Sequence, residues 1–320
     1  TFADGADIIT ASAGTSNFRA GVNAGNSIAS GGNYNVVVGD EAGTAITTGD
    51  GNVAIGFNAL TTEDAHGQNV AIGYKALEDL NAGVDGLNTA VGYAAGLNVT
   101  TGVQNTLIGG LAGDALTDAD FNVAVGTDAL HSDTLGSRSV AVGRRSLYTQ
   151  NFTSATDSYN IGVGFNAGYS ITTGVQNTLI GGLAGDAITT GESNVAVGYL
   201  SLSDNTTGGD NTAVGELALS NNTTAIRNTA LGSSALFTNT TGADNTAIGT
   251  GSLYANTTAS FNTGVGQNSL ENNTTGASNT AVGRDSLKAN TTGADNTAVG
   301  KGAMLAATTS PSNTVIGHTS

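Results

Sequence analysis

The side chains best suited to metal binding or acid–base catalysis are three histidines, His66, His131 and His318. Each stands in a turn or near the end of the chain, with no acidic partner at a useful spacing. Cysteine is absent, so there is neither a disulfide framework nor a thiolate site. The serines and threonines recur as parts of a repeat, and a nucleophile would need a base that the sequence does not offer. We therefore expect no catalytic residue, no metal site, no cofactor and no enzymatic activity.

Aromatic side chains could recognise a sugar. Phe57, Tyr74 and Tyr93 occupy the same place in three consecutive copies of the repeat, and Phe237 and Tyr254 form a shorter pair elsewhere. Stacked at a turn, the three rings would make an aromatic ladder. Alternatively, their faces would form a platform for the ring of a carbohydrate. The sequence leaves both interpretations open.

Six asparagines begin Asn-x-Thr sequons at constant spacing: Asn205, Asn222, Asn239, Asn256, Asn273 and Asn290. In a cell that glycosylates such sites, they would carry a row of glycans along one edge of the protein. The repeat copies the turn, so the number of sequons is not independent support. The adjacent threonine pairs also suggest an ice-binding face, although such a face would need alternating threonines on an exposed strand.

All these residues belong to a repeat of seventeen residues that begins with asparagine. The motif Asn-Thr-Ala-Val-Gly at Asn211 returns at that interval through Asn313, and eighteen starts can be traced back to Asn17. With the asparagine numbered as position 1, position 5 is glycine in every copy. Three spacings are longer, by one residue after Asn17, two after Asn69 and four after Ser139. A fixed short period indicates a chain that stacks one small unit on itself.

The composition of one repeat predicts the fold. Positions 2 and 4 are rich in Val, Ile and Thr, which favour a short strand, and no 3.6-residue periodicity supports a helix. Turn-forming segments such as Asn-Thr-Thr-Gly follow. We predict an all-β parallel β-solenoid of about eighteen coils, each with two short strands and two turns. Residues 17–320 would form it, and residues 1–16 would be a degenerate coil or a segment that joins subunits.

Positions 9 and 12 vary together. Position 9 is Leu or Met in most coils and position 12 is then normally polar or small, as in Leu236 with Asn239; Leu80, beside an insertion, is the exception. In six coils position 9 is Gly and position 12 becomes apolar, as in Gly43 with Ile46. Because interiors tolerate neither voids nor excess volume, we expect both positions to fill one interior space. We also expect the asparagines at position 1 to form a column of mutually bonded amides.

Charge excludes some partners. The net charge of −16, with only nine Lys and Arg, disfavours nucleic acid and an anionic membrane surface. No apolar run approaches the ~20 residues of a membrane span, so we expect no membrane insertion.

The first strand of a coil has no polar face, since positions 2 and 4 carry Thr, Val, Ile or Leu in every coil after the first, which has Phe18 and Ala20. A thin coil can cover one side of such a strand and leaves the other as an apolar stripe. In the C-terminal half this stripe comprises Val197, Val214, Leu231, Ile248, Val265, Val282 and Val299. A lateral homo-oligomer, most simply a homotrimer, would cover it.

The motif Asn-Thr-Ala-(Val/Ile)-Gly, followed by a small residue and Leu, resembles the head repeats of trimeric autotransporter adhesins and the repeat shafts of phage tail fibres. The resemblance covers Asn17 to Gly317. It implies a parallel β-roll in which three chains pack together, at a cell surface or on a virion. The adhesin repeats have a shorter period than the present one.

We therefore expect an extracellular, non-catalytic structural fibre or adhesin-like rod whose partner is itself, with a surface glycan or receptor as a further partner. One alternative is a subunit that polymerises head to tail into an extracellular filament, with residues 1–16 completing the coil begun at Asn313 of the next copy. A second alternative is a carbohydrate- or ice-binding β-solenoid.

Overall fold

The computed structural model describes residues 12–318 and confirms a parallel β-solenoid with about eighteen turns. The described residues contain strands and turns but no helix. The chain divides into two compact units, one of Thr1–Arg145 with Gln150–Asp157 and one of Ser146–Thr149 with Ser158–Ser320. Most of the segment 1–16 lies outside the described residues, so its predicted role stays a prediction.

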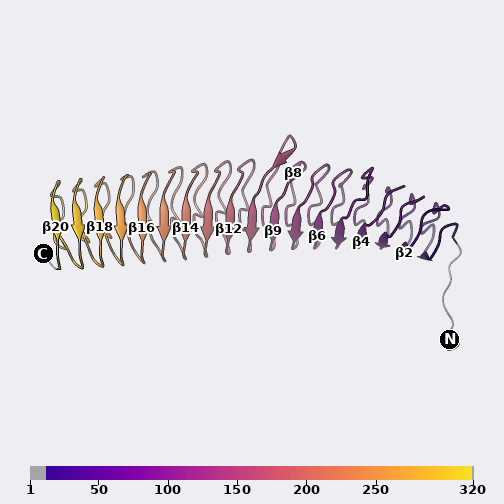
Figure 1. Cartoon of the computed structure of the whole chain (residues 1–320), viewed down its shortest axis with the longest axis horizontal. Coiled ribbons are helices and arrows are strands. Elements are labelled where there is room, and N and C mark those ends of the chain that lie inside the picture. Colours follow the sequence, from indigo (N-terminus) through magenta and orange to yellow (C-terminus); the bar gives the residue numbers. More distant parts are fainter. Residues whose placement is uncertain (1–11, 319–320) are drawn as a thin grey trace, which may run out of the picture. The chain divides into compact units, whose positions relative to one another are not determined.

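The first unit contains eight repeat strands that pair in parallel from one coil to the next, and a separate two-stranded sheet (Figure 1). The repeat strands are β1 (Phe18–Ala20), β2 (Val36–Val38), β3 (Val53–Ile55), β4 (Val70–Ile72), β5 (Thr89–Val91), β6 (Thr106–Ile108), β7 (Val123–Val125) and β9 (Val140–Val142). The separate sheet joins β8 (Gly136–Ser137) to β10 (Thr156–Asp157).

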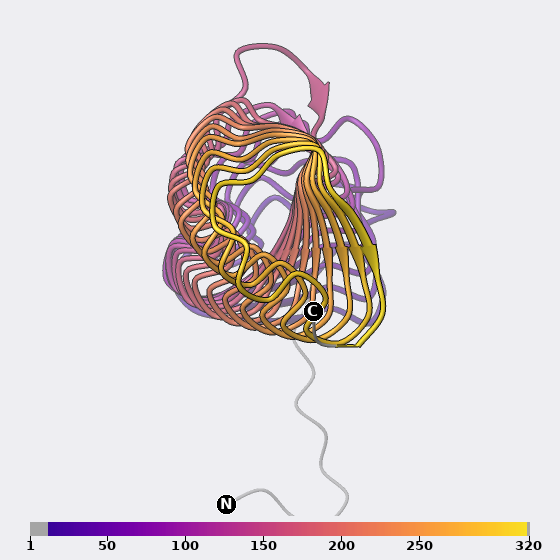
Figure 2. The ribbon, with the colours of Figure 1, turned by 90° about the vertical axis from the view of Figure 1, so that its left-hand side faces the viewer.

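The second unit contains ten repeat strands and follows the seventeen-residue period throughout. They are β11 (Ile161–Val163), β12 (Thr178–Ile180), β13 (Val195–Val197), β14 (Thr212–Val214), β15 (Thr229–Leu231), β16 (Thr246–Ile248), β17 (Thr263–Val265), β18 (Thr280–Val282), β19 (Thr297–Val299) and β20 (Thr314–Ile316). In the end-on view, its orange to yellow coils lie one behind the other, with their strands along one side (Figure 2).

Each strand covers positions 2 to 4 and pairs in register with the next coil. Thr212, Ala213 and Val214 of β14 lie opposite Thr229, Ala230 and Leu231 of β15. The alanine points into the coil and is fully buried, while the residues at positions 2 and 4 point outward. The β-branched residues suit this extended backbone, and the small alanine leaves room for the interior side chains.

Among the described residues, each coil has one repeat strand, and only the coils that contribute β8 and β10 have a second; the prediction of two strands in every coil was wrong. Beyond position 5 the backbone repeatedly enters the left-handed region, for example at Leu217 (φ 58°) and Leu219 (φ 52°) at positions 7 and 9. Left-handed residues cannot continue an extended strand. The coils nevertheless stay bonded to each other here, since Leu219 N–H donates to the Ala235 carbonyl at 2.9 Å.

The glycine at position 5 ends each strand and is required for two reasons. At Gly215 the φ of 132° lies in a region that only glycine enters readily. A Cβ there would also lie 2.7 Å from the carbonyl carbon of Gly232 in the next coil. Close stacking of backbone on backbone therefore explains the glycine in coils that are followed by another, while Gly317 of the last coil has only its φ of 149° as a reason.

The shared interior volume of positions 9 and 12 is confirmed. Leu236 at position 9 and Ile46 at position 12 are both fully buried. At Gly43, an added Cβ would lie 2.8 Å from the Cδ1 of Ile46, so the isoleucine occupies the space that a larger residue would need. A Gly-type coil thus fills from position 12 the space that a Leu-type coil fills from position 9.

The asparagines at position 1 are buried, but the predicted column of mutually bonded amides is only part of their bonding. The Oδ1 of Asn211 accepts the backbone N–H of Asn228 in the next coil at 3.0 Å. Its Nδ2 donates to the Ala225 carbonyl of its own coil at 2.8 Å and to Asn194 Oδ1 at 3.2 Å. One amide therefore closes its own coil and ties it to both neighbours, which explains why asparagine recurs here.

Candidate functional site

The outer face of the strands is a surface feature that recurs from coil to coil in each unit. In the second unit, the position-4 residues Leu231, Ile248, Val282 and Val299 are 36–47% exposed, and Val197, Val214 and Val265 are half-buried. Their strands pair in register, so these side chains form one unbroken column. We call this column, together with the neighbouring position-2 residues, the strand face. It contains no charged residue from β11 to β20.

The threonines at position 2 form a second column on the same strand face. Thr212, Thr229 and Thr246 lie opposite one another in β14 to β16 and are half-buried. Each coil thus presents one threonine and one aliphatic residue outward. The other threonines, at the turn, are used differently: Thr206 Oγ1 donates to the Thr223 carbonyl at 3.1 Å. The ordered outward threonines are therefore those on the strand, and not the threonine pairs at the turn that suggested an ice-binding face in the sequence.

The predicted aromatic ladder is present. The ring centroids of Phe57 and Tyr74 lie 5.5 Å apart, and those of Tyr74 and Tyr93 lie 5.3 Å apart with nearly parallel planes. Both faces of Tyr74 therefore meet a neighbouring ring. A sugar platform would need open faces, so this geometry favours the ladder. Phe237 with Tyr254 forms a similar stacked pair at 5.2 Å, and so does Tyr148 with Tyr169 at 5.1 Å, which the sequence analysis missed.

The sequon asparagines point into the coils and not outward. Asn205, Asn222, Asn239, Asn256, Asn273 and Asn290 are fully buried. In Asn239, Nδ2 donates to Asn222 Oδ1 and to the Gly242 carbonyl, both at 2.9 Å. This amide ladder leaves no accessible acceptor nitrogen in the folded chain. The structure therefore offers no support for a row of glycans along an edge.

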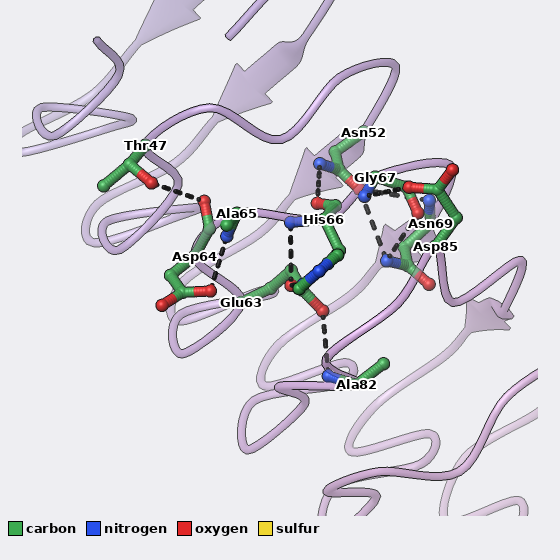
Figure 3. A network of polar contacts seen from close by, with 10 residues as sticks. All are labelled: Thr47, Asn52, Glu63, Asp64, Ala65, His66, Gly67, Asn69, Ala82 and Asp85. Carbon is green, nitrogen blue, oxygen red and sulfur yellow. Dashed lines mark hydrogen bonds and ion pairs between the residues drawn. The ribbon is translucent and has the colours of Figure 1, made fainter. Parts of the chain in front are cut away.

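Two histidines do have acidic neighbours, and the prediction that they lack them was wrong. His66 Nδ1 lies 3.7 Å from Glu63 Oε1, in a turn drawn in Figure 3. His131 Nδ1 lies 2.6 Å from Asp114 Oδ1. Asp114 is seventeen residues before His131 and occupies the same position in the preceding coil, which is why a search for local partners missed it.

Glu63, Asp64 and His66 are the one group of metal-binding side chains among residues 12–318 whose ligand atoms lie within 4.8 Å of one another. The carboxylate of Glu63 is fully buried and already accepts the backbone N–H groups of His66 and Ala82, each at 3.3 Å (Figure 3). Glu63 thus holds the turn in place. A metal would have to compete with these two bonds, so the geometry is explained without one.

Buried carboxylates recur at position 12 of the first unit. Asp133, like Glu63, is fully buried and accepts the backbone N–H three residues later, from Gly136 at 3.0 Å. Gln150 Nε2 also donates to Asp133 at 2.6 Å. Burial raises the pKa of Glu63 and of Asp133 above the ordinary range, although the hydrogen bonds oppose this. Burial likewise raises the pKa of Asp114, which His131 opposes.

A polar pocket of about 440 Å³ lies beside the separate sheet of the first unit. It is lined by Asp118, Asp120, Phe121, Ser137, Arg138, Ala155, Thr156 and Asp157. Arg138 lies 4.7 Å from the centroid of the Phe121 ring, and its Nη1 is 3.4 Å from Asp157 Oδ1. The four-residue insertion that creates this region is visible in the sequence, but no sequence pattern pointed to these lining residues.

A scan against models of known protein families finds no match, and a search of curated proteins finds none either. The resemblance to adhesin heads and tail fibres therefore rests on the repeat motif and on the β-solenoid that it forms. Within residues 12–318, no helix has the length and apolar character to cross a membrane.

Proposed function

We propose that this chain is a non-catalytic structural protein of an extracellular fibre or adhesin-like assembly at a cell surface or on a virion. Three copies would pack together through the strand face. The observation that carries the proposal is the uncharged, half-exposed column of Val, Leu and Ile at position 4. Soluble monomers rarely expose a large continuous apolar surface, and such surfaces usually mark an interaction site.

The regularity of the strand face supports another copy of the chain as its partner. Paired strands lie about 4.8 Å apart, so the face repeats one aliphatic and one threonine side chain at that interval. A second copy has the same interval and keeps its side chains in register with the first over many coils. The motif's resemblance to trimeric adhesin heads supports three copies.

The test is the double variant Val214→Asp with Val282→Asp. Each aspartate would place an unpaired charge in the proposed interface, so light scattering should report a fall from the mass of the assembly to that of one chain. The matched control is Thr250→Asp with Gln267→Asp, which adds the same charge at exposed turn positions. The proposal fails if both double variants keep the parental mass.

Ice binding is a second candidate function, because of the threonine column on the strand face. Thr212, Thr229, Thr246, Thr263, Thr280 and Thr297 sit at position 2 of six strands that pair in series. Each of these strands supplies one outward, half-buried threonine next to an aliphatic residue at position 4. Ice binding would use the same surface as self-association, so it requires that the parent chain be monomeric. Thermal hysteresis in a monomeric parent chain, and none after Thr229→Lys, would favour this second function.

A further inference from the structure

The polar pocket of the first unit lies where the repeat is interrupted. Four extra residues between Ser139 and Asn160 let β10 pair with β8, and this small sheet projects beyond the neighbouring coils (Figure 1). The stack does not need this insertion. Arg227 and Asp244 form an Arg–Asp ion pair like that of Arg138 and Asp157, with Arg227 Nε 2.6 Å from Asp244 Oδ1, at the ends of two seventeen-residue coils that have no insertion. The stacking of coils therefore does not explain why the four residues are inserted here.

The pocket combines hydrogen-bond acceptors, a donor and an aromatic ring. Asp118 accepts a hydrogen bond from Thr101 Oγ1, and Asp120 accepts one from the backbone N–H of Val103 at 2.8 Å. A carboxylate can accept about four hydrogen bonds, so both retain capacity for a ligand. Arg138 supplies N–H donors in a planar fork, and Phe121 as a whole is 41% exposed.

The charges of the lining residues select the class of ligand. Three carboxylates and one guanidinium leave the pocket net negative, which disfavours an anion. The guanidinium of Arg138 disfavours a compact cation in its vicinity. The three carboxylates do not converge as metal ligands do, since the one such cluster among residues 12–318 is that of Glu63. A neutral ligand rich in hydroxyl groups satisfies both the acceptors and the donor.

We propose that this pocket binds a neutral saccharide. Its hydroxyl groups donate to the carboxylates of Asp118, Asp120 and Asp157, its ring or hydroxyl oxygens accept from Arg138, and its apolar C–H groups contact Phe121. The volume of about 440 Å³ is in the range of small-molecule sites. None of the lining residues belongs to the strand face, so this proposal stands independently of lateral assembly.

The experiment uses the full chain and the methyl glycosides of glucose, galactose and mannose, with glucuronate and spermidine as charged probes. Saturation-transfer NMR identifies binding and titration calorimetry gives its strength. At least one neutral glycoside should bind, and Asp157→Asn or Arg138→Ala should weaken it about tenfold, as expected for the loss of one charged hydrogen bond. Arg227→Ala, which removes the ion pair with Asp244 and none of the lining residues, should leave binding unchanged.

Several results would overturn the proposal. They are the absence of binding by all three glycosides, tighter binding of glucuronate or spermidine, and unchanged glycoside binding in Asp157→Asn. Loss of binding in Tyr74→Ala would move the sugar site to the aromatic ladder and would equally contradict the pocket. Circular dichroism melting of each variant shows whether the fold is retained, and Asp157→Asn keeps the size of the side chain in case Arg138→Ala disturbs the loop.

Discussion

For a single residue in this chain, the neighbour that matters is often seventeen positions away. His131 pairs with Asp114, and Arg227 Nε lies 2.6 Å from Asp244 Oδ1. Both pairs join equivalent positions of adjacent coils. The period alone predicts such contacts once it is applied to every position, whereas a search among nearby residues misses them. The exposed ion pairs are worth little in stability, so their main interest is as markers of the register between coils.

The buried amide ladder ends at Asn290, and this end can be tested. Asn290 Nδ2 donates to Asn273 Oδ1 at 2.8 Å, but its own Oδ1 is buried without a partner. The equivalent residue of the next coil is Ala307. We predict that Ala307→Asn supplies the missing donor and raises stability by about 1 kcal/mol. Ala307→Asp has nearly the same size but no amide N–H, so it should bring no gain; an equal rise in melting temperature in both variants would contradict the ladder.

Asp186 should make stability depend on pH. Burial raises its pKa from 3.8 to about 6, with a smaller contribution from Asp204. A carboxyl with a raised pKa in the folded state stabilises the fold when protonated, and this contribution is lost as pH rises from about 4 through 6. We predict that Asp186→Asn gains stability relative to the parent over that range, by on the order of 1–3 kcal/mol at pH 7. Denaturant unfolding at pH 4 and pH 7 measures this, and a constant difference would refute it.

At the scale of the coil, the short strand and the close stacking both depend on glycine. Gly109 has φ 136°, and a Cβ there would lie 2.5 Å from the Gly126 carbonyl oxygen. Its neighbour Gly110 has open space around it. We predict that Gly109→Ala costs more than about 3 kcal/mol, while Gly110→Ala is neutral or stabilises by up to about 1 kcal/mol. Thermal unfolding of the two variants compares them, and similar losses would contradict the stacking explanation.

The exchange between positions 9 and 12 gives a second prediction for the coil. Leu236→Gly should destabilise the chain by roughly 2–5 kcal/mol for the lost core side chain, less about 1 kcal/mol because the left-handed backbone there suits glycine. Adding Asn239→Ile should recover part of this loss. The recovery is partial because Asn239 bonds to Asn222 and Asn256 in the amide ladder. If the double variant is no more stable than the single one in urea, the two positions do not share a space.

For the whole chain, the repeat made the fold predictable, but it did not predict the left-handed backbone at position 9 or the pocket beside the insertion. The period, the strand at positions 2 to 4 and the interior at positions 9 and 12 follow from residue types that recur at fixed places. The second strand was predicted wrongly because leucine at position 9 gives no sign of a left-handed backbone, as at Leu236 (φ 52°). The pocket beside β8 and β10 could not be predicted as a whole, since Phe121 and Arg138 are one period apart but Asp157 reaches Arg138 only through an insertion that follows no period.

The most direct test of the proposed function is the mass of the purified chain in solution. If the strand face is covered by other copies, light scattering coupled to size exclusion should report three times the 31.3 kDa of one chain at micromolar concentration. This mass should fall to that of one chain in Val214→Asp with Val282→Asp. A parent chain that elutes at 31.3 kDa and stays soluble at this mass would contradict lateral assembly, because the apolar column would then be exposed to water.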